Sequence, residues 1–333
     1  MIQGIVFSKD RAVQLDAVLH SFYLHCQDAD QVNISVLYMA TDERHARQYK
    51  TLMGDYPRVT FIEQTNFRKD ILSMLSPYHR DSLQNRIYHL LTGSGKIKLR
   101  KGESSDAGWR GSAERIIFFA LQKVLPAIPK MEFILFLVDD NLFVRDFKLI
   151  DAKASLEITP RAFGFSLRLG INTTYCYTQN QSQAIPSFTI LPGDILQFNW
   201  INAQYDFNYP LELSSSMYPT AVILPLIAGL DFRNPNELEG QMAAHRWLLQ
   251  DKYPILCCYS KSVTFCNPVN MVQSVFPNRA GGHFPYSVGE LTSRFEQGER
   301  IKVEAYINYT PNACHEEVEL IFSKEKRQRL AND

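Results

Sequence analysis

The alternation of strand-like and helix-like segments between residues 4 and 63 constrains the fold more than any other feature of the chain. Short apolar runs alternate there with longer segments whose apolar side chains recur at helical spacing, in the order 4–8, 10–24, 33–39, 43–53 and 59–63. A strand, helix, strand, helix, strand order forms a parallel sheet with right-handed crossovers. The sequence therefore predicts an α/β protein with a mostly parallel central sheet flanked by helices.

A further strand-like run ends in a cluster of oxygen-bearing side chains. Residues 133–138 are continuously apolar, as in a strand covered on both faces, and Asp139, Asp140 and Asn141 follow at once. Ligands of parallel sheets bind beyond the carboxyl ends of the strands. Carboxylate and amide oxygens there suit Mg²⁺ or Mn²⁺, which share their ligands with substrate phosphates. The same residues could equally form a turn after the strand.

Composition excludes several other classes of protein. With 333 residues, 45% of them hydrophobic, the chain can bury a sizeable core, and its 35 basic and 35 acidic residues favour neither a nucleic-acid partner nor an anionic membrane surface. The apolar run at the N-terminus is too short for a signal peptide or a transmembrane segment. We expect a cytoplasmic protein, or one peripheral at the inner membrane face. The cysteines lack metal-ligand spacing, which predicts buried, reduced thiols.

The rest of the chain divides at the acidic cluster. Residues 66–108 are mostly polar and show no regular strand or helix pattern, and their glycines and Lys96 do not have the spacing of a P-loop. A helix is predicted over 112–125, directly before the acidic strand. Beyond residue 146, strands are predicted at 163–167, 221–226 and 255–265, with mixed pairing. Asn236 followed by Glu239 predicts a capping box at the start of a helix.

These features together resemble nucleotide-sugar glycosyltransferases of the GT-A fold, and family 2 in particular. The likeness lies in Phe7-Ser8-Lys9-Asp10-Arg11 with the helix after it, in Thr41-Asp42 at the second strand end, in the helix before the acidic strand, and in Leu137-Val138-Asp139-Asp140-Asn141. It covers roughly residues 2–270. The resemblance implies a GT-A (Rossmann-like) sheet with a smaller mixed-sheet acceptor region. It divides the chain into a donor half (1–146), an acceptor and catalytic half (147–290) and a C-terminal extension (291–333).

The resemblance also implies site residues by position. The donor-binding positions are Ser8, Arg11, Thr41, Arg115, Asp139, Asp140 and Arg279, and the ligands of Mn²⁺ or Mg²⁺ are Asp140, Asn141 and His283. A bound cation would neutralise the leaving diphosphate. Structural roles compete with these: Ser8 and Thr41 could be turn residues or caps, Arg11 a surface charge and Arg115 a member of a helix-surface ion pair.

Transfer with inversion also requires a carboxylate that accepts the proton of the acceptor hydroxyl. Glu237 and Glu239 fall at the position where the family places this base, and Glu237 is the preferred candidate because the capping box would explain Glu239. Failing both, the base would be Asp194, Asp206 or Asp231. Retention of stereochemistry stays open.

The resemblance predicts a cation-dependent glycosyltransferase of glycan (polysaccharide) biosynthesis. Its partners would be a UDP- or GDP-sugar donor and a glycan or lipid-linked acceptor, with no nucleic acid and no transmembrane segment. A nucleotidyltransferase is an alternative, but the expected glycine-rich loop is missing after the first strand, where residues 8–13 read SKDRAV. A non-catalytic protein that binds a glycan or a nucleotide is the other alternative, suggested by Asn141 in place of an aspartate.

Overall fold

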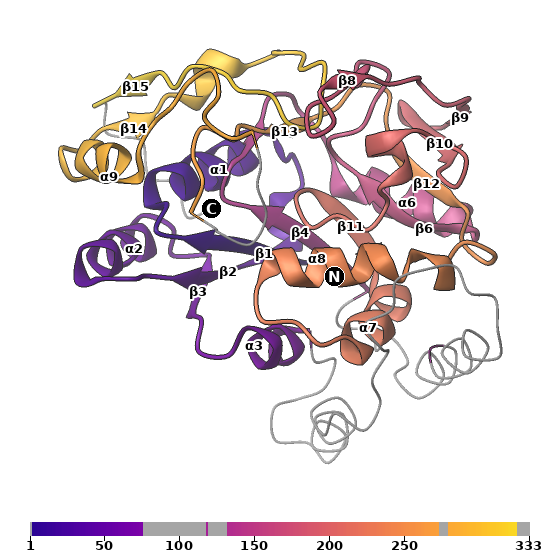
Figure 1. Ribbon diagram of the computed structural model, residues 1–333, viewed down its shortest axis with the longest axis horizontal. Helices are drawn as coiled ribbons and strands as arrows, with labels where there is room; N and C mark the ends of the chain where they lie inside the picture. The colour runs from indigo at the N-terminus through magenta and orange to yellow at the C-terminus, as the bar shows by residue number, and fades with distance from the viewer. Residues whose placement is uncertain (1, 76–117, 119–131, 273–278, 325–333) are drawn as a thin grey trace.

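The strands predicted between residues 4 and 63 and at 133–138 pair in parallel and form part of a nine-stranded sheet. The computed structural model describes residues 2–75, 118, 132–272 and 279–324 (Figure 1). In spatial order the strands are β3 (Thr60–Glu63), β2 (Val32–Met39), β1 (Ile2–Lys9), β4 (Phe133–Val138), β11 (Ser216–Pro219), β6 (Ala162–Ser166), β12 (Ile255–Tyr259), β10 (Ile195–Asn199) and β9 (Thr189–Leu191). Of these, β11 and β10 run against their neighbours and all the others point the same way. The predicted mostly parallel central sheet is therefore confirmed, and the mixed pairing of the second half extends this same sheet.

Helices cover both faces of the sheet, which gives three layers (Figure 1). One face carries α1 (Ala12–His25), α2 (Glu43–Asp55), α6 (Leu149–Ile158) and α9 (Val288–Glu296). The other carries α3 (Phe67–Met74), α7 (Thr220–Gly229) and α8 (Pro235–Ala244). Along β1, Val6 faces the first group whereas Ile5 and Phe7 face the second, as the alternation of side chains along a strand requires. Both sides of the strand are apolar because both are covered.

Smaller elements lie around this core. The short strands pair antiparallel as β5 (Asn141–Phe143) with β13 (Thr264–Cys266), β7 (Tyr175–Cys176) with β8 (Gln181–Ser182), and β14 (Arg300–Ile301) with β15 (Phe322–Ser323). The 3₁₀ turns are η1 (Ala29–Gln31), η2 (Tyr205–Asn208), η3 (Arg246–Leu248) and η4 (Val303–Tyr306). The C-terminal elements α9, β14 and η4 pack against α1 (Figure 1). Residues 291–324 thus belong to the same hydrophobic core as the donor half.

Two predicted strands take other forms. Residues 221–226 lie in helix α7, which is buried on nearly all sides, so its apolar run carries no periodicity that could distinguish a helix from a strand. Residues 255–265 form two strands, β12 and β13, separated by a bend at 260–263. That bend moves β13 off the main sheet and onto β5 beside the acidic cluster.

The capping box predicted at Asn236 and Glu239 is wrong by two residues. Helix α8 begins at Pro235, and the side chain of Asn234 accepts a hydrogen bond from Glu237 N at 2.9 Å. Proline suits the first helical position because the amide it lacks would have no partner there. The shift leaves Glu239 inside the helix without a capping role.

The described residues allow a comparison with the predictions about membrane segments and cysteines. None of the helices in those ranges combines the length and apolarity needed to cross a bilayer. All six cysteines are buried and free, as predicted from their spacing.

Substitution of Phe136 tests the packing of the central sheet. It is 0% exposed, and its ring lies 6.0 Å from the Phe7 ring and 6.3 Å from the Tyr218 ring, so it joins three neighbouring strands. We expect Phe136→Ala to lower the free energy of unfolding by about 3–5 kcal/mol, because it leaves a cavity as well as losing buried area. The control is Ile190→Ala on the edge strand β9, where the side chain is 79% exposed. Equal loss in both variants, measured by denaturant titration, would contradict this packing.

Candidate active site

The acidic cluster forms the turn between β4 and β5. The side chain of Asn141 is 0% exposed; its Oδ1 accepts from Val138 N at 2.9 Å and its Nδ2 donates to Cys266 Sγ at 3.5 Å. This side chain closes the turn and points into the protein, so the predicted role of Asn141 as a metal ligand is corrected to a structural one. The turn interpretation thus holds for Asn141, while Asp139 and Asp140 remain at the carboxyl edge of the sheet.

Arg11 lies between the two aspartates. Because Phe7 of β1 pairs with Val138 of β4, the residues that follow both strands leave the sheet at the same edge. The Arg11 guanidinium Nη1 is 3.0 Å from Asp139 Oδ1 and 3.9 Å from Asp140 Oδ2. Arg11 is 9% exposed, so it is a buried counter-ion of the acidic pair and not the surface charge considered from the sequence.

Burial and charge oppose each other in this group. Burial alone would lower the pKa of Arg11, but the charges of Asp139 and Asp140 outweigh it and raise the pKa. Burial raises the pKa of Asp140, with the negative charge of Asp139 adding to it and Arg11 opposing it. Asp140 Oδ1 and Arg11 Nε are buried without a hydrogen-bond partner in the described protein. A polar ligand bound here could form hydrogen bonds with these two atoms.

The described residues do not fit a shell of protein ligands around a divalent cation. Asp139 already uses both oxygens, one for Arg11 and the other for Lys9 N at 3.2 Å. His283 lies on an exposed turn. Across residues 2–75, 118, 132–272 and 279–324, no group of three or more His, Cys, Asp and Glu side chains is arranged to hold a metal ion.

The other donor positions are placed as follows. Ser8 is buried, with its hydroxyl 2.7 Å from that of Tyr49. Thr41 is exposed and donates through N and Oγ1 to the carboxylate of Asp10, at 2.8 and 2.9 Å. Both side chains thus make contacts within the protein at strand ends, and their predicted contacts with a donor stay a prediction. Arg115 lies outside the described residues.

Arg279 belongs to a turn near the C-terminal segment. Its guanidinium lies 4.8 Å from the centroid of the Tyr177 ring, and its Nη1 donates to Tyr177 O at 2.7 Å. The carboxylate of Glu317 accepts hydrogen bonds from the backbone N of Gly282, His283 and Phe284 at 2.7–3.0 Å. A contact of Arg279 with a diphosphate stays a prediction, since its side chain is held by Tyr177 here.

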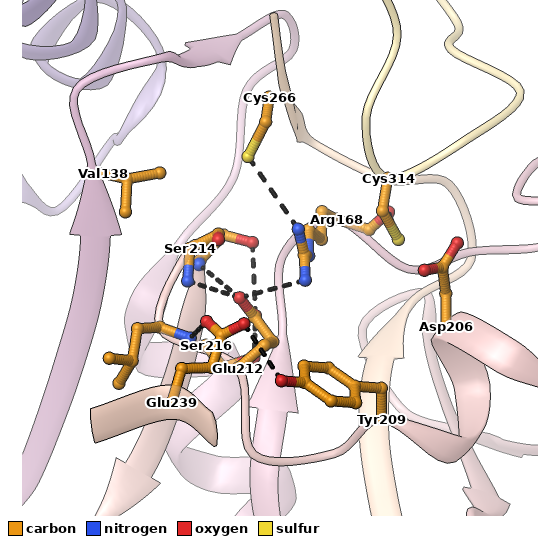
Figure 2. A network of polar contacts seen from close by, with 12 residues as sticks. Val138, Arg168, Asp206, Tyr209, Glu212, Ser214, Ser216, Glu239, Cys266 and Cys314 are labelled. Carbon is orange, nitrogen blue, oxygen red and sulfur yellow. Dashed lines mark hydrogen bonds and ion pairs between the residues drawn. The ribbon is translucent and has the colours of Figure 1, made fainter. Parts of the chain in front are cut away.

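A second polar cluster lies beside the acidic turn, at the ends of β6 and β4 (Figure 2). Arg168 Nη2 is 3.3 Å from Glu212 Oε2, and both side chains are buried. Arg168 Nη1 reaches Cys266 Sγ at 3.9 Å, and Cys266 in turn contacts Asn141. The two clusters are therefore joined through a single thiol. Each borders a hollow: one lined by Gln14, Asp139, Asp140 and Asn267, the other by Arg168, Asp206, Tyr209 and Cys314.

The two glutamates of this second cluster differ in their hydrogen-bond and ion-pair partners. Glu212 accepts from the backbone N of Ser214 and Ser215 and from the Ser216 hydroxyl as well as pairing with Arg168, which gives it a structural role. Glu239 accepts from Leu213 N at 2.8 Å and from the Tyr209 hydroxyl at 3.2 Å (Figure 2). It forms no ion pair in the part of the chain that the structure describes, although the charge of Arg168 acts on it. Burial raises the pKa of Glu239, and the neighbouring charge of Glu212 adds to this.

The two candidate bases therefore lie in different surroundings. Glu237 forms an ion pair with Arg233, Oε1 to Nη2 at 2.9 Å, on the outer side of α8, whereas Glu239 points into the polar cluster. The preference for Glu237 rested on the misplaced capping box, so that reason is wrong, and the choice of the base stays a prediction. Among the other candidates, Asp206 lines the hollow near Arg168, and burial raises its pKa. Asp194 bonds Ser260 beside a strand end, and Asp231 is exposed after α7.

Several residues of the site carried little sequence signal. Glu212 could have been found, because it stands between two leucines and is followed by three serines that can donate hydrogen bonds to it. His315 and Glu317 lie in a C-terminal segment without periodicity, and only the tertiary structure brings them to Arg168 and to the turn at 282–284.

The chain was compared with known proteins. No known family profile matches it. It is 25% identical over 304 residues to the bifunctional glycosyltransferase pgtA of Dictyostelium discoideum, a match covering 83% of this chain and 33% of that protein. The chain thus spans about a third of the length of the curated relative it matches. The resemblance to glycosyltransferases inferred from the sequence is confirmed by this relative.

Solved structures of glycosyltransferases also match at low similarity. S. aureus TarS 1–349 in complex with UDP-GlcNAc is 14% identical, with a TM-score of 0.38, over 80% of this chain and 58% of that one. Mouse xyloside xylosyltransferase 1 is 11% identical, with a TM-score of 0.29, over 76% of each chain. At these TM-scores the likeness carries no argument about ligands or chemistry.

His315 makes the stability of the second cluster dependent on pH. Burial, with the nearby charge of Arg168, lowers the pKa of His315 to about 3. Its ordinary value is about 6.5, so below that pH the unfolded chain takes up a proton that the folded protein refuses. The stability contributed by neutral His315 is therefore complete above pH 6.5 and is lost as the pH falls toward 3.

We expect this histidine to account for up to about 2 kcal/mol of lost unfolding free energy between pH 7 and pH 5. His315→Gln, which does not titrate but can still accept a hydrogen bond from Arg168, should lose less stability than the unmodified protein over this range. The exposed His283→Gln is the matched control. Denaturant titrations at both pH values measure the difference, and identical pH dependence in all three proteins would contradict the assignment.

Proposed function

We propose that the chain is a glycosyltransferase that moves a sugar from a nucleoside-diphosphate donor to a hydroxyl acceptor. The observation that carries the proposal is the placement of Asp139 and Asp140 at the carboxyl edge of β4, beside the end of β1, in a chain similar to a glycosyltransferase over 83% of its length. In a mostly parallel sheet this edge is where ligands bind. A glycan or lipid-linked acceptor, and a role in glycan biosynthesis, belong to the same proposal.

The two polar clusters suggest a division of labour. The cluster of Arg11, Asp139 and Asp140 adjoins the ends of the N-terminal strands, and we assign the donor to it. The cluster around Arg168 and Glu212 lies on the second half of the sheet, and we assign the acceptor to it. This assignment follows the division into residues 1–146 and 147–290.

Glu239 supplies the chemistry that an inverting transfer requires. The reaction breaks the anomeric bond to the diphosphate while the acceptor hydroxyl loses its proton, so a carboxylate must take that proton. Glu239 lies in the acceptor cluster, and burial raises its pKa, which makes it a stronger base than an exposed glutamate. The Tyr209 hydroxyl and Leu213 N hold its two oxygens in place.

A thermal-shift screen tests the donor site. The chain is melted with UDP, GDP, CMP or dTDP, each in EDTA and in Mn²⁺, so that the answer does not depend on a cation. We expect one nucleotide to raise the melting temperature, since binding to the native state alone stabilises it by about 2.7 kcal/mol at 100 times Kd. If Asp140 holds the nucleotide through a cation or through its ribose hydroxyls, Asp140→Ala should weaken that shift. No shift with any nucleotide in either condition would remove the support for a nucleotide-sugar enzyme.

The nucleotide found in this way sets the sugar donors for an activity assay. Transfer of the sugar to an acceptor hydroxyl, with release of the nucleoside diphosphate, identifies a glycosyltransferase, whereas pyrophosphate release from a nucleoside triphosphate identifies a nucleotidyltransferase. Nucleotide binding with neither activity identifies a non-catalytic binding protein.

Exchanging each candidate glutamate for glutamine tests the base. We expect Glu239→Gln to lower kcat by about 10²–10⁴-fold, the usual contribution of a general base. The glutamine can still accept from Leu213 N, so the melting temperature should change little. In the unmodified enzyme, activity should fall on the acidic side at a higher pH than for an ordinary carboxylate, because protonated Glu239 cannot act as a base. If Glu237→Gln caused the loss and Glu239→Gln did not, the assignment would be reversed.

A further inference from the structure

We propose that Arg11 is the resident cation of the acidic pair, and that a nucleoside diphosphate binds beside Asp139 and Asp140 without a divalent cation. The inference rests on the proposed function for its ligand, but the geometry of Arg11 stands independently. It departs from the cation requirement that the resemblance to other enzymes implies.

The position of the guanidinium is the first argument. Its Nη1 lies 3.0 Å from Asp139 and 3.9 Å from Asp140, within the space where a bridging cation would contact both carboxylates. Arg11 stays charged at any pH at which the protein is folded. A divalent cation would have to displace it or bind against its charge, and like charges a few ångströms apart repel more strongly near a protein than in bulk water.

The anchoring of Arg11 is the second argument. Nη2 donates to Asn270 O at 2.5 Å, and Arg11 immediately precedes helix α1, whose backbone begins at Ala12. The Arg11 backbone N also contacts the Tyr49 hydroxyl at 3.4 Å. With Asp139, these contacts hold both ends of the residue, so displacing the guanidinium would break its hydrogen bonds to Asp139 and to Asn270 O together.

The incomplete acidic shell is the third argument. Asp139 gives both oxygens to groups of this chain, and Asn141 is turned inward, so Asp140 Oδ1 is left as the buried acidic oxygen without a partner. Arg11 Nε is likewise buried without a partner. The protein therefore offers an anionic ligand an N–H donor at this place, in addition to the charge that the guanidinium already carries.

Titration with Mn²⁺ alone tests the charge argument without any nucleotide. The full chain, Arg11→Met and the surface control Arg44→Met are compared by calorimetry. We expect Mn²⁺ to bind Arg11→Met at least roughly tenfold more tightly than the other two, because the repelling charge is gone. The gain should vanish in Arg11→Met with Asp140→Asn. If the unmodified chain bound Mn²⁺ as tightly as Arg11→Met, the inference would be overturned.

If Arg11→Met folds poorly, two further measurements still test the proposal. Arg11→Lys keeps a positive charge, so it should remain as insensitive to Mn²⁺ as the unmodified chain; tight Mn²⁺ binding by this variant would contradict the charge argument. In the unmodified chain, the nucleotide that raises the melting temperature should do so equally in EDTA and in Mn²⁺. A shift that required Mn²⁺ would overturn the inference and leave the proposed glycosyltransferase standing. No shift in either condition would count against the proposed function, while the Mn²⁺ titration would still decide the role of Arg11.

Discussion

The parallel pairing of β1 with β4 sets the positions of the charged groups on which the site depends. With Phe7 opposite Val138, the chain leaves both strands at the same edge, and Arg11 meets Asp139 and Asp140 there. A slip of one residue would turn the side chains of β4 to opposite faces of the sheet. The close packing of individual side chains, such as Phe136 with Phe7 and Tyr218, opposes such a slip, so the core fixes the geometry of the polar edge.

Buried charges in this protein occur in compensated groups. Arg11 stands between two aspartates, and Arg168 pairs with Glu212, which backbone and hydroxyl donors also satisfy. Removing a charge from water costs several kcal/mol, which only a well-placed partner offsets. Glu239 is held by hydrogen bonds and forms no ion pair within the described residues, and the charge of Arg168 only partly offsets the effect of burial on its pKa. A carboxylate whose pKa is raised by burial is a feature of sites that move protons.

The periodicity of the sequence predicted the N-terminal strands and helices and the strand before the acidic turn, because amphipathic spacing and continuous apolar runs are local signals. It failed at residues 221–226, where an apolar run fits a buried helix as well as a strand. It also misplaced the start of α8, since Asn234 and Asn236 are both good caps and Pro235 decides between them. The preference for Glu237 over Glu239 rested on that error.

The sequence by itself determined the α/β class and the presence of Asp139 and Asp140 at the carboxyl edge of the sheet, where we propose the site. Only the tertiary structure decided what those carboxylates contact, because Arg11 and Asn141 are placed by long-range pairing of β1, β4 and β13. Whether an arginine is a surface charge or a buried counter-ion depends on residues more than a hundred positions away, and no local pattern records this. The same holds for Glu239, whose burial and raised pKa arise from neighbours on separate elements.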